Sequence, residues 1–158
     1  MPLRILCPDW RDPRNVGSAF RLADAVGVRD LILAGTSPRP PAKLIAKTAR
    51  STVRSVPWTG TPSAADYLRE MRAAGHLVLA LEVTDQSVSL LEYELPRLAG
   101  GQDIILVPGT EDSGVAADLL DLCDASVHLP MAGQNTSMNV VVALGAAVYL
   151  LLQQLGKA

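Results

Sequence analysis

Five short, mostly apolar runs, separated by segments of helical periodicity, do most to limit how this chain can fold. The runs are 4–7, 30–35, 77–82, 103–107 and 126–129. They lack the polar alternation of a half-buried strand, and such runs are typical of strands buried on both faces of a parallel sheet. The pattern therefore predicts an α/β fold with a mostly parallel sheet and helices on both of its faces.

Helix start and stop signals lie between these runs. Asn15 and Ser63 are expected N-caps, Gly27 and Gly75 are expected stops, and Pro41 suits the first position of a helix. The expected helices are 15–27, 41–50, 63–74, 116–122 and 137–152, with a short edge strand at 56–58.

The length of 158 residues, with 49% hydrophobic content, fits one well-filled domain over 1–158. Cys7 and Cys123 lie far apart within apolar surroundings, which indicates buried thiols in a reducing compartment. The N-terminus shows no apolar signal segment, and the apolar stretch 140–152 is too short to span a bilayer. We therefore expect a cytoplasmic protein with no membrane partner.

The net charge of −2 hides an asymmetry along the chain. Residues 1–65 contain ten Lys or Arg and four Asp or Glu, a charge of +6, whereas 66–158 contain four and twelve, a charge of −8. A basic stripe without acidic residues is formed by Arg39, Lys43, Lys47, Arg50 and Arg54. Their spacing places them on one face if 41–50 is helical. The stripe is either a solvated face or, as we favour, a surface for phosphates of a nucleic acid.

Polar residues follow three of the predicted strands, in the loops after Cys7, Val107 and Leu129. Ligands of parallel sheets bind at the carboxyl ends of strands. The last loop, 129–139, runs into the apolar segment at 140, so Thr136 or Ser137 is expected to cap that helix and leave free N–H groups in its first turn. An ordinary capped helix explains that loop equally well.

Several common sites are not supported by the sequence. Neither a G-x-G-x-x-G nor a G-x-x-x-x-G-K-[ST] motif is present, which argues against a dinucleotide site and a P-loop. His76 and His128 have no Cys or His partner at ligand spacing. We therefore expect neither a metal site nor a Ser-His-acid triad.

Three motifs in order nevertheless resemble those of a known family. They are Asn15-x-Gly17-x-x-x-Arg21-x-Ala23, then Val107-Pro108-Gly109-Thr110-Glu111-Asp112-Ser113-Gly114-Val115, then Leu129-Pro130-Met131 followed by Ser137-Met138-Asn139-Val140. They resemble the SpoU (TrmH-like) branch of the SPOUT RNA methyltransferases over essentially the whole chain. The resemblance implies a C-terminal trefoil knot, S-adenosyl-L-methionine as methyl donor, a homodimer, and transfer to a ribose 2′-hydroxyl of RNA. The chain resembles the minimal members without an added RNA-binding domain, several of which act on the anticodon loop of tRNA.

The resemblance also implies roles for individual residues. The catalytic set would be Arg21, Asn15, Glu111, Ser137 and Asn139. The cofactor would contact Leu81, Glu82, Val83, Gly109, Leu129, Met131 and Ser137. RNA would contact Arg14 and the basic stripe Arg39, Lys43, Lys47, Arg50 and Arg54, and no metal is needed. The family's arginine is often described as the base, but a guanidinium resists deprotonation, so stabilising a developing alkoxide is the easier role for Arg21.

Two departures from the family pattern bear on function. Asp112 stands where a small residue is commoner and adds a negative charge beside Glu111, and Met138 replaces a usual Leu, which is a mild change. We favour a tRNA 2′-O-methyltransferase whose dimer forms through helix 137–152. An rRNA 2′-O-methyltransferase, a base-methylating enzyme and a non-catalytic RNA-binding module that retains the fold remain alternatives.

Overall fold

The computed structural model describes residues 1–156 and contains one seven-stranded sheet. The strands are β1 (Leu3–Pro8), β2 (Asp30–Ala34), β3 (Trp58–Thr61), β4 (Leu77–Leu81), β5 (Val88–Ser89), β6 (Ile104–Pro108) and β7 (Ala125–His128). Their order across the sheet is β3-β2-β1-β6-β4-β7-β5, and each neighbouring pair is parallel. The predicted parallel α/β sheet is confirmed.

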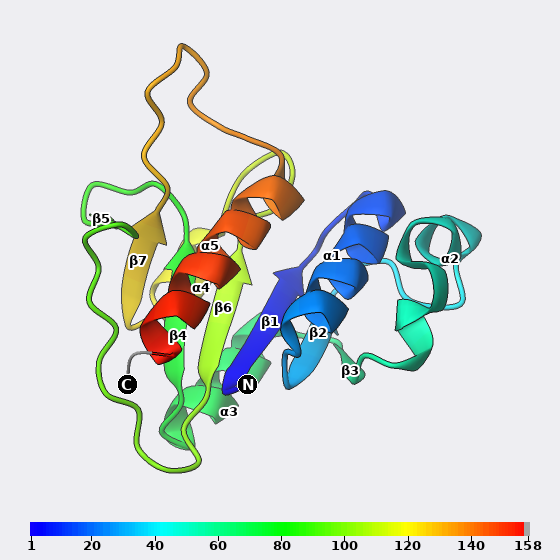
Figure 1. Ribbon diagram of the computed structural model, residues 1–158, viewed down its shortest axis with the longest axis horizontal. Helices are drawn as coiled ribbons and strands as arrows, with labels where there is room; N and C mark the ends of the chain where they lie inside the picture. The colour runs from blue at the N-terminus through cyan, green and yellow to red at the C-terminus, as the bar shows by residue number, and fades with distance from the viewer. Residues whose placement is uncertain (157–158) are drawn as a thin grey trace.

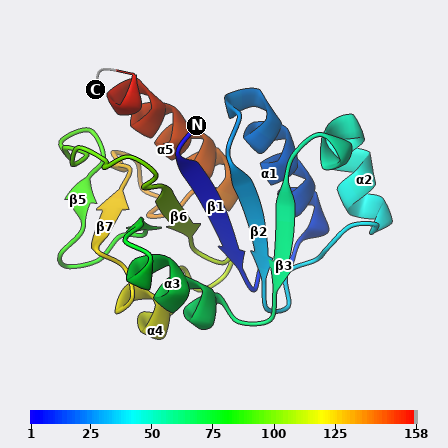
Figure 2. The ribbon, with the colours of Figure 1, turned by 90° about the horizontal axis from the view of Figure 1, so that it is seen from below.

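Helices cover both faces of this sheet (Figures 1 and 2). The helices are α1 (Pro13–Val26), α2 (Lys43–Ala49), the 3-10 helix η1 (Arg50–Arg54), α3 (Ala64–Ala73), α4 (Ala117–Leu120) and α5 (Val140–Leu155). One core lies between the sheet and α1, α2 and α5, and a second lies between the sheet and α3 and α4. The trefoil knot stays a prediction of the resemblance.

The central strand β6 explains why the apolar runs could be recognised in the sequence. All five of its residues are buried, because β1 and β4 flank it and helices cover both faces. A strand in this position has no polar face, so its sequence is continuously apolar. The two-residue strand β5 was not predicted, and the edge strand β3 begins at Trp58 instead of residue 56.

Two predicted helix caps were wrong. Helix α1 is capped by Asp12, which accepts a hydrogen bond from the N–H of Arg14, and Pro13 occupies its first turn, so Asn15 lies inside the helix. Helix α5 begins at Val140 and is capped by Asn139, not by Thr136 or Ser137. The predictions of Ser63 as a cap and of Gly27 as a left-handed stop are confirmed.

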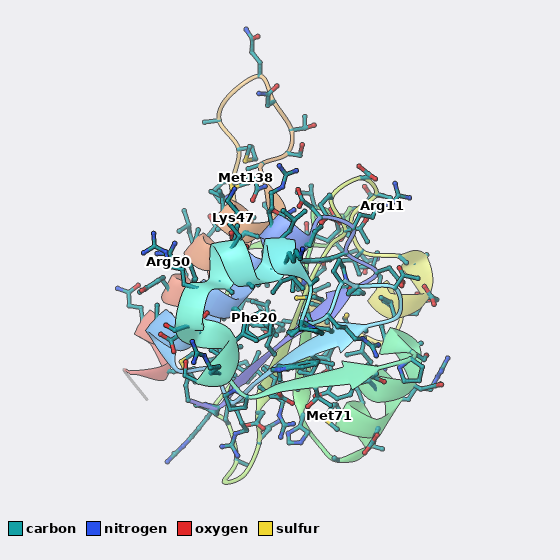
Figure 3. The ribbon with its side chains drawn as sticks, turned by 90° about the vertical axis from the view of Figure 1, so that its right-hand side faces the viewer. Arg11, Phe20, Lys47, Arg50, Met71 and Met138 are labelled. Carbon is teal, nitrogen blue, oxygen red and sulfur yellow. The ribbon has the colours of Figure 1, made fainter. Side chains whose placement is uncertain are left out.

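The basic stripe does not lie on one helical face. Helix α2 begins only at Lys43, with Ala42 as its cap, so Pro41 is not its first residue. The helix ends at Ala49, and Arg50 has a φ of 57°, which turns the chain into η1. Lys43 and Lys47 therefore share a face of α2, and Arg50 and Arg54 follow on a differently oriented segment. All four side chains are exposed (Figure 3 labels Lys47 and Arg50).

Two further expectations concern the thiols and the apolar C-terminal helix. Cys7 is buried and Cys123 is partly buried, and both are free, as predicted. Burial raises the pKa of Cys123 to about 12 and raises that of Cys7 further. None of the helices within residues 1–156 is long and apolar enough to cross a membrane.

Candidate active site

A cavity of about 310 Å³ opens at the carboxyl ends of β4, β6 and β7, beside the start of α5. The register explains its position, because Leu81 at the end of β4 pairs with Pro108 at the end of β6 and with Val127 of β7. All seven residues that the resemblance assigns to the cofactor line it, namely Leu81, Glu82, Val83, Gly109, Leu129, Met131 and Ser137. The fold thus brings three distant segments of the sequence, 81–83, 109 and 129–137, together around one cavity.

A hydrogen-bond network joins the three motifs at the rim of this cavity. Asn15 of α1 donates from Nδ2 to Glu111 Oε1 at 3.1 Å, and Asn139 donates from Nδ2 to Asn15 Oδ1 at 3.4 Å. The Oδ1 atom of Asn139 in turn accepts from the N–H groups of Val141 and Val142, at 2.9 and 3.3 Å. The first-turn N–H groups that were expected to be free are therefore partly occupied. Because Asn139 both caps α5 and contacts Asn15, the orientation of α5 is coupled to the rim.

The carboxylate of Glu111 ties the β1–α1 loop to the turn after β6. It accepts from the backbone N–H of Asp12 at 3.0 Å and from that of Arg11 at 3.1 and 3.2 Å. Partial burial acts to raise the pKa of Glu111, but the hydrogen bonds from Asp12, Asn15 and Arg11 outweigh it and hold the pKa below its usual value. Glu111 is therefore an ionised acceptor that fixes the rim, instead of a proton donor at neutral pH.

The lowered pKa of Glu111 predicts an acid-dependent loss of stability. A carboxylate with a depressed pKa stabilises the fold fully above its unfolded pKa of about 4.3, and this contribution disappears as the pH falls through the folded value. We expect Glu111→Gln to lower the urea midpoint at pH 7 and to narrow its gap to the unaltered chain below about pH 4. Glu94→Gln, in an exposed segment, should leave the midpoint unchanged. A gap that stays constant with pH would contradict this role.

Trp10, which the sequence analysis missed, and Glu82 hold the same turn from beneath. The indole N–H of Trp10, which is fully buried, donates to the carbonyl of Gly109 at 3.0 Å. Glu82 accepts from the N–H of Val115 at 2.7 Å and from that of Val83 at 2.9 Å. Both oxygens of Glu82 are engaged by backbone groups, so Glu82 supports the cavity wall as well as lining it.

The Asp-Pro pair at 12–13, a usual helix start, was the one local signal for the true cap of α1.

The turn after β6 leaves no room for side chains at its glycines. A Cβ atom on Gly109 would lie 2.5 Å from the Cα atom of Gly114, and Gly114 itself has a φ of 69°. The turn is closed by a bridge between Thr110 and Gly114. Glycine at 109 is thus required by close backbone approach, which the sequence indicated only through the family motif.

Residues from the third motif line the cavity from a projecting loop. The segment 131–139 extends away from the body of the molecule (Figure 1). Every residue of this segment is exposed, and Met131, Ser137, Met138 and Asn139 line the cavity at its base. Ser137 is therefore near the cavity, as expected, although it does not cap α5.

Arg21 is not among the residues that line the cavity. It is an exposed side chain of α1, on the same helix as Asn15, and within residues 1–156 it makes no hydrogen bond or ion pair. Two other predicted RNA contacts are engaged by the protein itself. Arg14 pairs with Asp12 at 2.9 Å, and Arg39 donates to the carbonyl of Thr61 at 3.0 Å. Arg39 is thus separated from the cations of α2 and η1.

Comparison with known proteins identifies the family of the chain. Residues 2–149 match the SpoU rRNA Methylase family. The 23S rRNA (guanosine-2′-O-)-methyltransferase RlmB of Ralstonia nicotianae is 31% identical over 153 residues, which cover 97% of this chain and 59% of that protein.

Two solved structures extend the comparison to the fold. The AdoMet-bound rRNA methyltransferase of Sinorhizobium meliloti superposes with a TM-score of 0.87 at 26% identity, over 97% of this chain and 56% of that one. A structure described as giving insights into 2-OH methylation of C/U34 on tRNA superposes with a TM-score of 0.84 over 100% of both chains. Its identity is 24%, so this likeness concerns the fold alone. The chain spans less than two thirds of the curated relatives it matches.

Proposed function

Because this chain belongs to the SpoU rRNA Methylase family, we propose that it transfers the methyl group of S-adenosyl-L-methionine to a ribose 2′-hydroxyl of RNA. The observation that carries the proposal is that all seven expected cofactor residues line the same cavity. Hydrogen bonds join Asn15, Glu111 and Asn139 at its rim. The 2′-O-methyltransferase relative and the AdoMet-bound neighbour support it.

The volume of the cavity, about 310 Å³, lies at the lower end of the usual range of ligand pockets, and its lining suits an S-adenosyl group. Its walls are apolar at Leu81, Leu129 and Met131, which suits an adenine ring, and Gly109 contributes to the lining. The cofactor supplies an already activated methyl group. What remains for the protein is to align the attacking oxygen and to exclude water, so no metal is required.

In this proposal the side chain of Arg21 contacts the RNA, and the rim residues position Arg21 by fixing the start of α1. Its guanidinium carries a charge that can stabilise the developing 2′-alkoxide and hold a neighbouring phosphate. Asn15, six residues earlier on α1, is held by Glu111 and Asn139, which fixes the end of that helix. Ser137 lines the cavity and would contact cofactor or ribose.

We further propose that the protein works as a homodimer through α5. Val142 and Tyr149, seven residues apart on this helix, are 61% and 57% exposed, which is unusual for large apolar side chains. A second copy of the chain is the expected occupant of this face, because a helix this apolar needs cover. Sedimentation of the protein as a monomer would contradict the dimer.

The proposed RNA surface comprises Lys43, Lys47, Arg50 and Arg54, with Arg14 nearer to the rim. These exposed cations lie on α2 and η1, whereas the acidic half of the chain, 66–158, contains α3, α4, α5 and the strands from β4 onward. We propose tRNA as the substrate, because a compact domain can recognise the shape of an RNA loop.

The decisive experiment is ribose-methylation mapping of tRNA and rRNA from cells with and without the gene, followed by methyl transfer in vitro. Loss of one 2′-O-methyl site, restored by the purified chain and S-adenosyl-L-methionine, is the expected result. A lost site in rRNA would replace tRNA as the substrate. No lost ribose methyl in either pool would contradict the proposed reaction and favour base methylation or a non-catalytic RNA-binding role.

A further inference from the structure

The loop between β1 and α1 holds Arg11 in a defined place beside the cavity. Asp9 adopts a φ of 48° and accepts a hydrogen bond from the N–H of Thr36 at 2.9 Å. Trp10 is fully buried, and its N–H donates to Ser37 Oγ at 2.8 Å. The backbone on both sides of Arg11 is thus fixed, since the N–H groups of Arg11 and of the next residue donate to Glu111.

The side chain of Arg11 reaches the family-atypical carboxylate of the neighbouring turn. Its Nη1 atom lies 2.7 Å from Asp112 Oδ2. The two side chains are 79% and 62% exposed, and Asp112 lines the cavity. Arg11 lies at the end of the molecule from which the 131–139 loop projects (Figure 3). The pair therefore faces solvent at the cavity mouth.

The charges around the cavity show why this pair matters. Three carboxylates line the cavity, those of Glu82, Glu111 and Asp112, and no Lys or Arg of the described residues does so. Glu82 and Glu111 accept hydrogen bonds from backbone N–H groups, whereas Asp112 has Arg11 as its ion-pair partner. Without Arg11, a full negative charge would stand at the mouth, where it would repel an incoming phosphate.

We propose that Arg11 is a positioning residue for RNA, which offsets the charge of Asp112 and so lets a phosphate approach the cavity. This inference rests on the proposed function. It differs from a purely structural role, because exposed ion pairs contribute little to folding stability and the loop is already held by Glu111 and Trp10. The affinity for RNA then depends on the net charge of the Arg11–Asp112 pair and not on the ion-pair contact itself.

The test uses the full chain without cofactor and measures filter binding of end-labelled, fragmented total cellular RNA. Arg11→Ala should weaken binding by about three- to tenfold at low salt, and Asp112→Asn should strengthen it by a similar factor. The double variant should return close to the unaltered chain, because its mouth is again neutral. These differences should largely vanish near 1 M salt, where the Debye length is about 3 Å.

A matched pair on another face serves as the control. Asp66 and Arg69 of α3 form an exposed ion pair, also at 2.7 Å, on the opposite side of the sheet from α1. Arg69→Ala and Asp66→Asn make the same charge changes there and should leave RNA binding nearly unaltered.

The sign of the Asp112→Asn effect decides between charge and structure. If Arg11→Ala and Asp112→Asn both weaken binding and the double variant does not recover, the pair is a structural brace and the inference is overturned. That outcome leaves the proposed function intact, provided that the unaltered chain transfers methyl groups to RNA. Failure of the unaltered chain both to bind and to methylate RNA would overturn the proposed function and this inference with it.

Discussion

Replacement of Arg21 by Ala is expected to lower kcat by about a hundredfold to a thousandfold, the usual effect of removing one group that stabilises developing charge. Affinity for S-adenosyl-L-methionine should stay the same, since Arg21 is exposed and does not line the cavity. Methyl transfer from labelled cofactor to RNA measures the first quantity, and calorimetric titration of the cofactor measures the second.

A second variant of Arg21 tests what its guanidinium does, and a variant of another exposed arginine serves as the control. Arg21→Lys keeps the charge but not the planar fork, so partial recovery would indicate charge stabilisation, whereas no recovery would indicate a bidentate grip on phosphate or ribose. Arg97→Ala removes an exposed arginine from the 91–98 segment and should have no effect. Unchanged turnover in Arg21→Ala would remove Arg21 from the mechanism.

Replacement of Gly109 by Ala is expected to lower cofactor affinity by about a hundredfold. The added Cβ would lie 2.5 and 2.6 Å from the Cα and C atoms of Gly114, which belong to the backbone and cannot rotate away. The turn must therefore shift away from the cofactor, and the loss of contacts worth about 2.7 kcal/mol corresponds to about a hundredfold in affinity. The same shift would disturb the bond from Trp10 to the Gly109 carbonyl.

Gly133→Ala is the control for this experiment. Gly133 lies in the projecting loop, and an added Cβ there meets no atom within 4 Å. It should leave cofactor titration and thermal unfolding unchanged. If Gly109→Ala binds the cofactor as tightly as Gly133→Ala does, the turn after β6 does not form the cofactor wall.

Much of the candidate site could be predicted because its residues lie in local motifs. Gly109, Leu129 and Met131 lie at or just after the ends of predicted strands, and strand ends in a parallel sheet meet at one edge. Trp10 and Arg11 could not be found in this way. Their importance depends on contacts with Gly109 and Asp112, about a hundred residues away, and no local pattern encodes such a contact.

The helix N-caps are a second case in which the sequence offers candidates and the structure selects among them. Several side chains near the start of α1 and of α5 can cap a helix, and the sequence could not choose among them. In the structure Asp12 caps α1 and Asn139 caps α5. Asn139 also donates from Nδ2 to Asn15 Oδ1 across the rim, a contact that only the tertiary structure creates.

The amino-acid sequence by itself determined the α/β class, the parallel sheet, the buried thiols and the family, because apolar runs and short motifs are local properties. Only the tertiary structure decided the strand order, the convergence of three motifs on one cavity and the pairing of Arg11 with Asp112. It also tied Arg39 to the carbonyl of Thr61, and it turned Arg50 and Arg54 away from the face of Lys43 and Lys47, since Arg50 adopts a positive φ at the start of η1. These features arise from packing between distant segments, which spacing along the chain does not specify.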